Sequence, residues 1–288
     1  MFRINSTSIK KQDENDDDFM GEHFCGHGNK WDALFGTAEY FMVEHMVKSV
    51  KKSSVLCQQE INGNKYAGLV YPDNSPIQVM SIIEAKDNKN EFTSAYPFLE
   101  GINNNLVVSS LYPWENQMEG EIAACADEGQ VFNFFDPLFA KDLPYLEPNK
   151  EKTFSLAALA YDIEYAENQV FQINKGGFYE VHLKEFLEAN PEKTKEDCPY
   201  VELKMEGCKM LLPTKETCVW EFRSSILDIE YIDFLDEKIA KMKIEIPRYE
   251  DEMMNIYLYA ARTLLNGYNP QVGDEIQGIL WLSGYLAS

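Results

Sequence analysis

The side chains best suited to metal chemistry gather near the start of the chain. Three of its four histidines and one of its six cysteines fall within residues 22–45, together with carboxylates. Imidazole, thiolate and carboxylate groups are ligands for zinc and related transition metals. The spacing matches neither a zinc finger nor an HExxH helix. The sequence therefore predicts either a zinc site or a set of structural and incidental residues at His23, Cys25, His27 and His45.

The carboxylates of residues 119–138 are a second candidate for chemistry. Glu119, Glu121 and Asp136 stand close to the aromatic run FNFF. An apolar neighbourhood raises the pKa of a carboxyl group, which can then donate a proton in catalysis. A simpler interpretation is that the two Glu residues face solvent from one side of a strand, and that Asp136-Pro137 ends the next strand. We favour this simpler interpretation.

The same stretch predicts a β-hairpin at the centre of the fold. Two apolar runs, 122–126 and 131–135, flank the turn residues Asp127-Glu128-Gly129. A hairpin is not stable alone, so other elements must cover it. We expect its apolar side chains to divide between two faces that are both covered. These side chains are Ile122, Val131, Phe132 and Phe134.

Other catalytic patterns are missing or unconnected in the sequence. Cys25 or Cys57 would need His45 or His182 nearby to act as a nucleophile, and no motif brings them together. The chain has no GxSxG elbow and no glycine-rich phosphate loop. We therefore assign no catalytic residues, and no cofactor beyond the candidate zinc ion.

The elements that would position these residues follow from periodicity. Residues 31–52 have apolar side chains at three- and four-residue steps and lysines at the end, which predicts an amphipathic helix. Residues 54–247 contain short alternating runs and turn signals such as Asn62-Gly63-Asn64, which predicts a β-rich region. Residues 249–265 return to a helical period before Asn266-Gly267, which predicts a second helix. Residues 272–286 predict a C-terminal strand bent at its glycines.

Together these elements predict an α+β fold. We expect a mostly antiparallel, strongly curved sheet or partly open barrel with a few peripheral helices, since glycines inside strands allow sheets to turn corners. Residues 1–20 are polar and acidic and predict a mobile arm. Residues 21–288 are expected to form a single domain.

The charge balance restricts the partners. The chain has 26 Lys and Arg against 48 Asp and Glu, a formal net charge of −22. Such a surface repels phosphate backbones and anionic lipids, so nucleic-acid binding and membrane attachment are disfavoured. It fits a soluble protein, or one that engages a basic protein partner. No apolar run is long enough to cross a membrane and the first residues have no hydrophobic centre, so we expect a cytoplasmic protein with reduced thiols.

Three functions are compatible with these patterns. The first is a non-enzymatic accessory or interaction protein that works through its acidic surface. The second is a metal-assisted hydrolase that uses the residues of 22–45. The third is a barrel that binds a small ligand through an aromatic lining.

Overall fold

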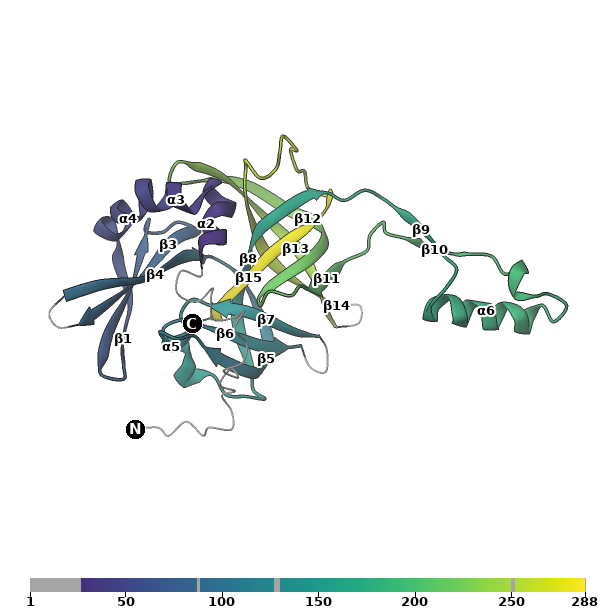
Figure 1. Cartoon of the computed structure of the whole chain (residues 1–288), viewed down its shortest axis with the longest axis horizontal. Helices are drawn as coiled ribbons and strands as arrows, with labels where there is room; N and C mark the ends of the chain where they lie inside the picture. The colour runs from purple at the N-terminus through teal and green to yellow at the C-terminus, as the bar shows by residue number, and fades with distance from the viewer. Residues whose placement is uncertain (1–26, 87–88, 127–129, 250–251, 288) are drawn as a thin grey trace. The chain divides into compact units, whose positions relative to one another are not determined.

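The computed structural model describes residues 27–86, 89–126, 130–249 and 252–287, which divide into two compact units. The larger unit joins the chain up to Tyr165 to the chain from Lys209 onward. The smaller unit, residues 166–208, is inserted between these two parts, and we call it the insertion. Figure 1 labels the helices and strands of both.

The helix predicted at 31–52 is confirmed as a helical segment, with an interruption. It consists of α2 (Gly28–Phe35), α3 (Ala38–Phe41), a π-helical turn (Met42–Met46) and α4 (Val47–Lys52). Gly36 follows α2 with a φ of 78°, a backbone angle that residues with a Cβ rarely adopt. Thr37 then accepts a hydrogen bond from Tyr40 N and caps α3. Trp31 and Phe41 stack with ring centroids 3.7 Å apart, so α2 and α3 share a buried face.

A four-stranded antiparallel sheet comes next, with its strands in chain order. The strands are β1 (Ser54–Ile61), β2 (Asn64–Tyr71), β3 (Ile77–Lys86) and β4 (Lys89–Leu99). Asn62 and Gly63 both have positive φ, which confirms the predicted hairpin turn between β1 and β2. Met80 and Tyr96 are fully buried in the same core as Trp31, so the helical segment covers this sheet.

The larger unit also contains a nine-stranded sheet. A short helix, α5 (Phe139–Asp142), and a 3-10 turn (Leu143–Tyr145) follow its third strand. The nine strands are β5 (Ile102–Pro113), β6 (Gly120–Cys125), β7 (Val131–Asp136), β8 (Glu151–Tyr165), β11 (Met210–Pro213), β12 (Val219–Phe234), β13 (Glu237–Tyr249), β14 (Glu252–Ala261) and β15 (Glu275–Leu286).

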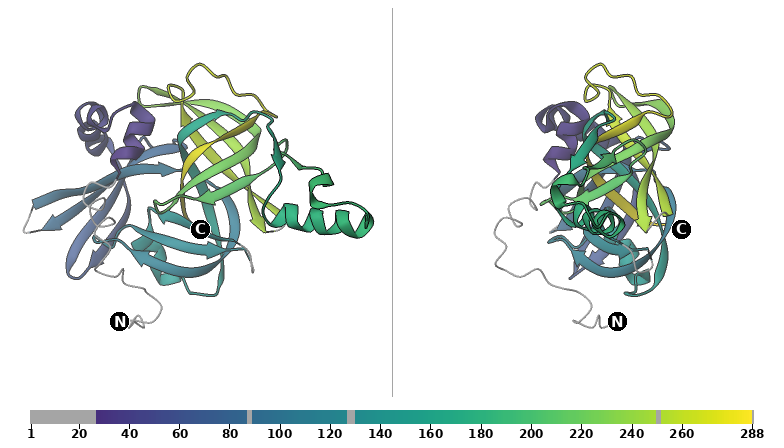
Figure 2. Two further views of the ribbon diagram at one scale, coloured as in Figure 1. Left: turned by 45° about the vertical axis from the view of Figure 1, so that its right-hand side comes forward. Right: turned by 90° about the vertical axis from the view of Figure 1, so that its right-hand side faces the viewer.

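Two additional pairings close this sheet into two rings with a common wall. Strand β12 pairs with β15 and closes a ring of β12, β13, β14, β8 and β15. Strand β5 pairs with β8 and closes a second ring of β8, β15, β7, β6 and β5. Strands β8 and β15 belong to both rings, because each is long enough to pair with different neighbours at its two ends (Figure 2). The predicted mostly antiparallel, barrel-like sheet is therefore confirmed.

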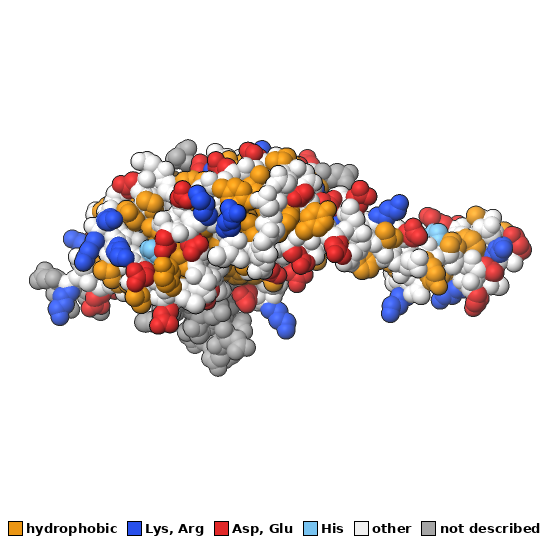
Figure 3. All heavy atoms as spheres, turned by 90° about the horizontal axis from the view of Figure 1, so that it is seen from above, with side chains coloured by type: hydrophobic (Ala, Val, Ile, Leu, Met, Phe, Trp, Pro, Cys, Tyr) orange, Lys and Arg blue, Asp and Glu red, His pale blue; other side chains and the backbone are white. Residues whose placement is uncertain are grey.

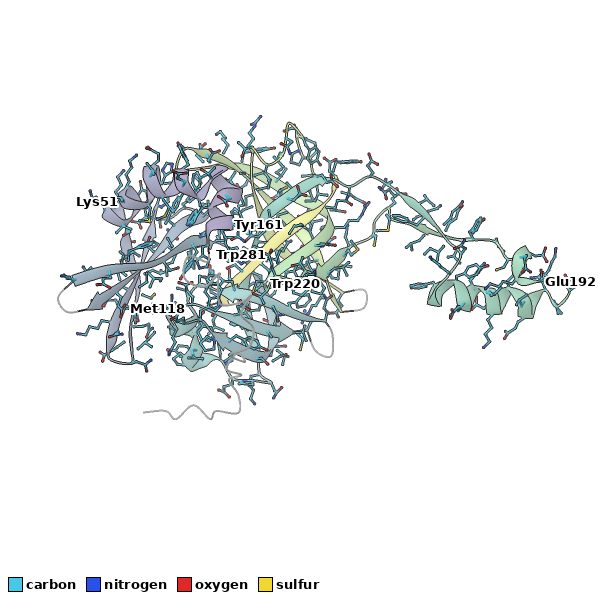
Figure 4. The ribbon with its side chains drawn as sticks, in the orientation of Figure 1. Lys51, Met118, Tyr161, Glu192, Trp220 and Trp281 are labelled. Atoms are coloured by element: carbon cyan, nitrogen blue, oxygen red, sulfur yellow. The ribbon has the colours of Figure 1, made fainter. Side chains whose placement is uncertain are left out.

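Side chains alternate between two hydrophobic cores on either side of the ring walls. Trp220 of β12 packs in the core formed by all the ring strands, while Trp281 of β15 packs in the core shared with the helical segment (Figure 4). The same alternation divides the confirmed β6–β7 hairpin, in which Phe134 faces the first core and Phe135 the second. Ile122 and Phe132 are also fully buried, but the expectation for Val131 is wrong, since 48% of it is exposed at the end of the strand.

The helix predicted at 249–265 is wrong, because residues 252–261 form strand β14. Met254, Ile256 and Leu258 belong to the first core, whereas Tyr259 and Ala261 belong to the second. A strand that is covered on both faces carries apolar residues on both, so its sequence loses the alternation that marks a strand. The predicted C-terminal strand at 272–286 is confirmed by β15.

The insertion has its own small set of elements within the region predicted to be β-rich. Strands β9 (Val170–Ile173) and β10 (Val201–Lys204) form a two-stranded antiparallel ribbon. Helix α6 (Gly177–Ala189) and a 3-10 turn (Lys195–Asp197) lie between them in the sequence. No helix in the part of the chain that the structure describes is long and apolar enough to cross a lipid bilayer.

Candidate functional site

His27, the residue before helix α2, lies in a buried polar cluster. Its Nε2 is 2.8 Å from Glu119 Oε2, and the exposed fractions of the two residues are 4% and 1%. Its ring stacks on Trp114 with centroids 5.2 Å apart and contacts two further aromatic rings. The side chain of Asn116 donates to the second Glu119 oxygen at 2.9 Å. The imidazole and the carboxylate are therefore held in a fixed geometry by groups on both sides.

Glu121 of β6, two residues after Glu119, is also buried. Its Oε1 accepts hydrogen bonds from Thr217 Oγ1 at 2.8 Å and from Trp114 Nε1 at 3.3 Å. Burial raises the pKa of Glu121, and the hydrogen bonds and the charge of Lys30 lower it in part. Lys30 is itself buried, with its Nζ 5.3 Å from the centroid of the Trp281 ring.

Our expectation that Glu119 and Glu121 face solvent is therefore wrong. Strand β6 lies between β5 and β7 in a sheet whose two faces are both covered, so side chains on either face are enclosed. The carboxylates are tolerated there because partners distant in sequence, His27 and Thr217, satisfy them.

Asp136 ends β7 as predicted, and it forms part of a buried carboxyl pair with Asp142. One Asp136 oxygen accepts a hydrogen bond from Leu138 N at 2.8 Å, and the other has no hydrogen-bond partner in the described part of the chain. Burial, and then the charge of Asp142, raise the pKa of Asp136. Burial raises the pKa of Asp142 to about 6, and this residue accepts from Leu286 N at 2.8 Å. Asp142 thus ties α5 to the end of β15.

The candidate zinc ligands do not form one group among the residues that the structure describes. His27 contacts Glu119, whereas His45 Nε2 lies 2.8 Å from Asp236 Oδ1, beside the ring of Phe35. His23 and Cys25 lie outside the described residues. Within the described ranges, no three His, Cys, Asp or Glu side chains are grouped as a metal site would require. The zinc site stays a prediction.

A small pocket opens beside the His27 cluster. Its volume is about 240 Å³, and its walls include His27, Trp31, Met42 and Phe92. It lies between α2 and β4, outside the rings, whose interior is filled by the side chains of the first core. A ligand inside either ring would have to displace these side chains, so ligand binding within the barrel also stays a prediction.

The insertion presents apolar side chains at its surface. Phe178 and Val181, one turn apart on α6, are 83% and 60% exposed, and Tyr200 is 57% exposed. Among large side chains of the insertion, Tyr179 is the one that is buried, and no disulfide joins Cys198 to Cys208. A chain segment of about 40 residues seldom builds a stable core without a disulfide, a metal or a partner.

The ribbon of the insertion extends this apolar surface. Its register places Phe171 opposite Leu203 and Ile173 opposite Val201, so these four side chains share one face. Phe171 and Leu203 are 47% and 48% exposed. Apolar side chains lie among carboxylates and lysines on the face of the insertion that Figure 3 shows. Exposed apolar patches with a polar surround are typical of surfaces that bind other molecules.

No family model, no curated protein and no solved structure matches this chain.

Sequence reasoning missed the insertion as a candidate site and missed the burial of Glu119 and Glu121. The sequence did contain a signal for the insertion, because the apolar residues of 166–208 do not follow a helical or strand period that would bury them. It contained no signal for the burial of the carboxylates, because His27 and Thr217 are 92 and 96 residues away from Glu119 and Glu121.

Proposed function

We propose that the protein is an acidic, cytoplasmic, non-enzymatic interaction protein that binds a basic protein through the insertion. The observation that carries this proposal is the exposed apolar surface of the insertion, with Phe178 at its most exposed point. Exposed aromatic side chains are the residues that most often anchor a protein interface.

Charge supports a basic partner over a second copy of the same chain. Residues 166–208 contain nine Asp and Glu against five Lys, and the whole chain has a net charge of −22. Two copies would repel each other, whereas a partner with Lys and Arg around an apolar patch would be attracted.

The test is partner capture with a surface variant. We expect immobilised wild-type protein to retain a basic protein, and the double variant Phe178→Ser, Val181→Ser to lose it. Because both positions are exposed, the variant should fold normally, which circular dichroism checks. Raising the salt concentration should weaken retention, since charges at the rim of the interface are screened.

Val272→Ser is a matched control, because Val272 is 60% exposed on the larger unit. It should retain the partner as the wild type does. Equal retention by the Phe178 and Val181 variant, or a retained partner that is acidic, would contradict the proposal. Self-association of the wild type in sedimentation experiments, lost in the variant, would assign the surface to a second copy instead.

A further inference from the structure

A second pocket, in the larger unit, combines aromatic walls with carboxylates. It has a volume of about 430 Å³ and lies between the strands β2, β3 and β4 and the loop that joins β5 to β6. Its aromatic walls are Tyr66, Phe92 and Trp114, and its carboxylates are Glu84, Glu91 and Glu115. We call it the aromatic–acidic pocket.

The carboxylates of this pocket are placed unfavourably for a sheet without a ligand. The strand register sets Glu84 directly opposite Glu91, and like charges in such a pair destabilise a sheet. Tyr66 lies opposite Glu84 on the other side and donates its hydroxyl hydrogen to Glu84 Oε1 at 3.2 Å. In the described part of the chain, neither Glu84 nor Glu91 forms an ion pair with Lys, Arg or His.

The aromatic wall formed by Trp114 is held in place before any ligand binds. His27 stacks on its ring at an interplanar angle of 13°, and Phe135 contacts it with centroids 5.1 Å apart. Its Nε1 donates to Glu121 at 3.3 Å. A ligand would therefore not have to order this ring, which favours affinity.

We propose that the aromatic–acidic pocket binds an organic cation with an alkylammonium head. Aromatic rings attract such a cation through their quadrupoles, and the carboxylates of the pocket supply the opposite charge. A metal ion fits less well, because it takes oxygen, nitrogen or sulfur ligands and gains little from aromatic walls. The pocket lies wholly in the larger unit, so this proposal stands whether or not the insertion binds a protein.

The probe is choline, and its uncharged isostere 3,3-dimethyl-1-butanol is the matched ligand control. By titration calorimetry on the full chain, we expect choline to bind saturably and the isostere not to. The double variant Glu84→Gln, Glu91→Gln should weaken choline binding roughly tenfold or more, and Phe92→Ala should weaken it several-fold. Glu151→Gln, an exposed strand Glu outside the pocket, should leave it unchanged.

A peptide that contains trimethyllysine distinguishes two sources of the cation, a protein side chain and a free amine. If a peptide with trimethyllysine binds more tightly than choline, and a norleucine peptide does not bind, the natural ligand is a side chain of a protein. If the peptide binds no better than choline, the ligand is a free amine. The proposal is overturned if neither probe saturates, if choline and its isostere bind equally, or if Mn²⁺ alone binds and is lost in the Glu variants.

Discussion

Among the residues that the structure describes, four carboxylates are buried in the larger unit, in three different surroundings. Glu119 contacts His27, Glu121 accepts from Thr217 and Trp114, and the remaining two form the pair Asp136 and Asp142. Burial disfavours the charged form of a carboxyl group, and it raises the pKa of Glu121, Asp136 and Asp142. The stability of the protein should therefore depend on pH through these three residues.

Asp142→Asn tests this dependence at one residue. Burial raises the pKa of Asp142 from 3.8 to about 6, so the folded state binds its proton more tightly than the unfolded state does. The free energy of unfolding should therefore fall as pH rises from about 4 to about 6 and stay lower above. Asn keeps the acceptor for Leu286 N without the charge, so the variant should be more stable at pH 7 by roughly 2 kcal/mol.

Urea unfolding at pH 4.5 and pH 7.5 measures this difference. The gain in stability should be roughly a third as large at the lower pH, because Asp142 is protonated there in the folded wild type but still largely ionised in the unfolded chain. The exposed Asp162→Asn is a control and should change little at either pH. An equal effect of Asp142→Asn at both pH values would show that the charge is not responsible.

At the scale of elements, strands β8 and β15 form the wall that both rings share, and their backbones approach each other very closely at the glycines of β15. A Cβ at Gly278 would lie 2.1 Å from the carbonyl oxygen of Asp162, and one at Gly284 would lie 2.4 Å from the side chain of Leu156. These glycines fit the bends expected in the last strand, since a register shift occurs just after Gly278.

Gly278→Ala should therefore force β15 away from β8. Because the clash is with backbone rather than with a flexible side chain, we expect a loss of roughly 2–4 kcal/mol in the free energy of unfolding. Gly177→Ala is the control, because a Cβ there meets no atom within 4 Å. Denaturant unfolding compares the two, and a loss below about 1 kcal/mol for Gly278→Ala would contradict the close packing.

At the scale of the whole molecule, the two units differ in how much apolar surface they enclose. The strands of the rings contribute most of the fully buried side chains, whereas Tyr179 is the buried large side chain of the insertion. Regions with few buried contacts open locally at low free energy, while central strands exchange their amide hydrogens by global unfolding.

Hydrogen exchange should reveal this difference directly. We expect the amides of β9 and β10 to exchange much faster than those of β13 and β14, whose strands pair along most of their length. Mass spectrometry of peptides from both regions measures the rates. Equal protection of β9 and β13 would mean that the insertion is as stable as the rings.

The sequence alone determined the features that depend only on residues close together in the chain. The turn at Asn62-Gly63, the hairpin around 122–135, the helical segment near 31–52 and the predominance of strands follow from local turn chemistry and periodicity. Only the tertiary structure decided the features that depend on contacts between residues far apart in the chain. The closure of two rings by β8 and β15, the strand at 252–261 and the burial of Glu119 against His27 all need residues far apart in the chain. Local patterns carry no information about such contacts, because the covering surface comes from elsewhere in the fold.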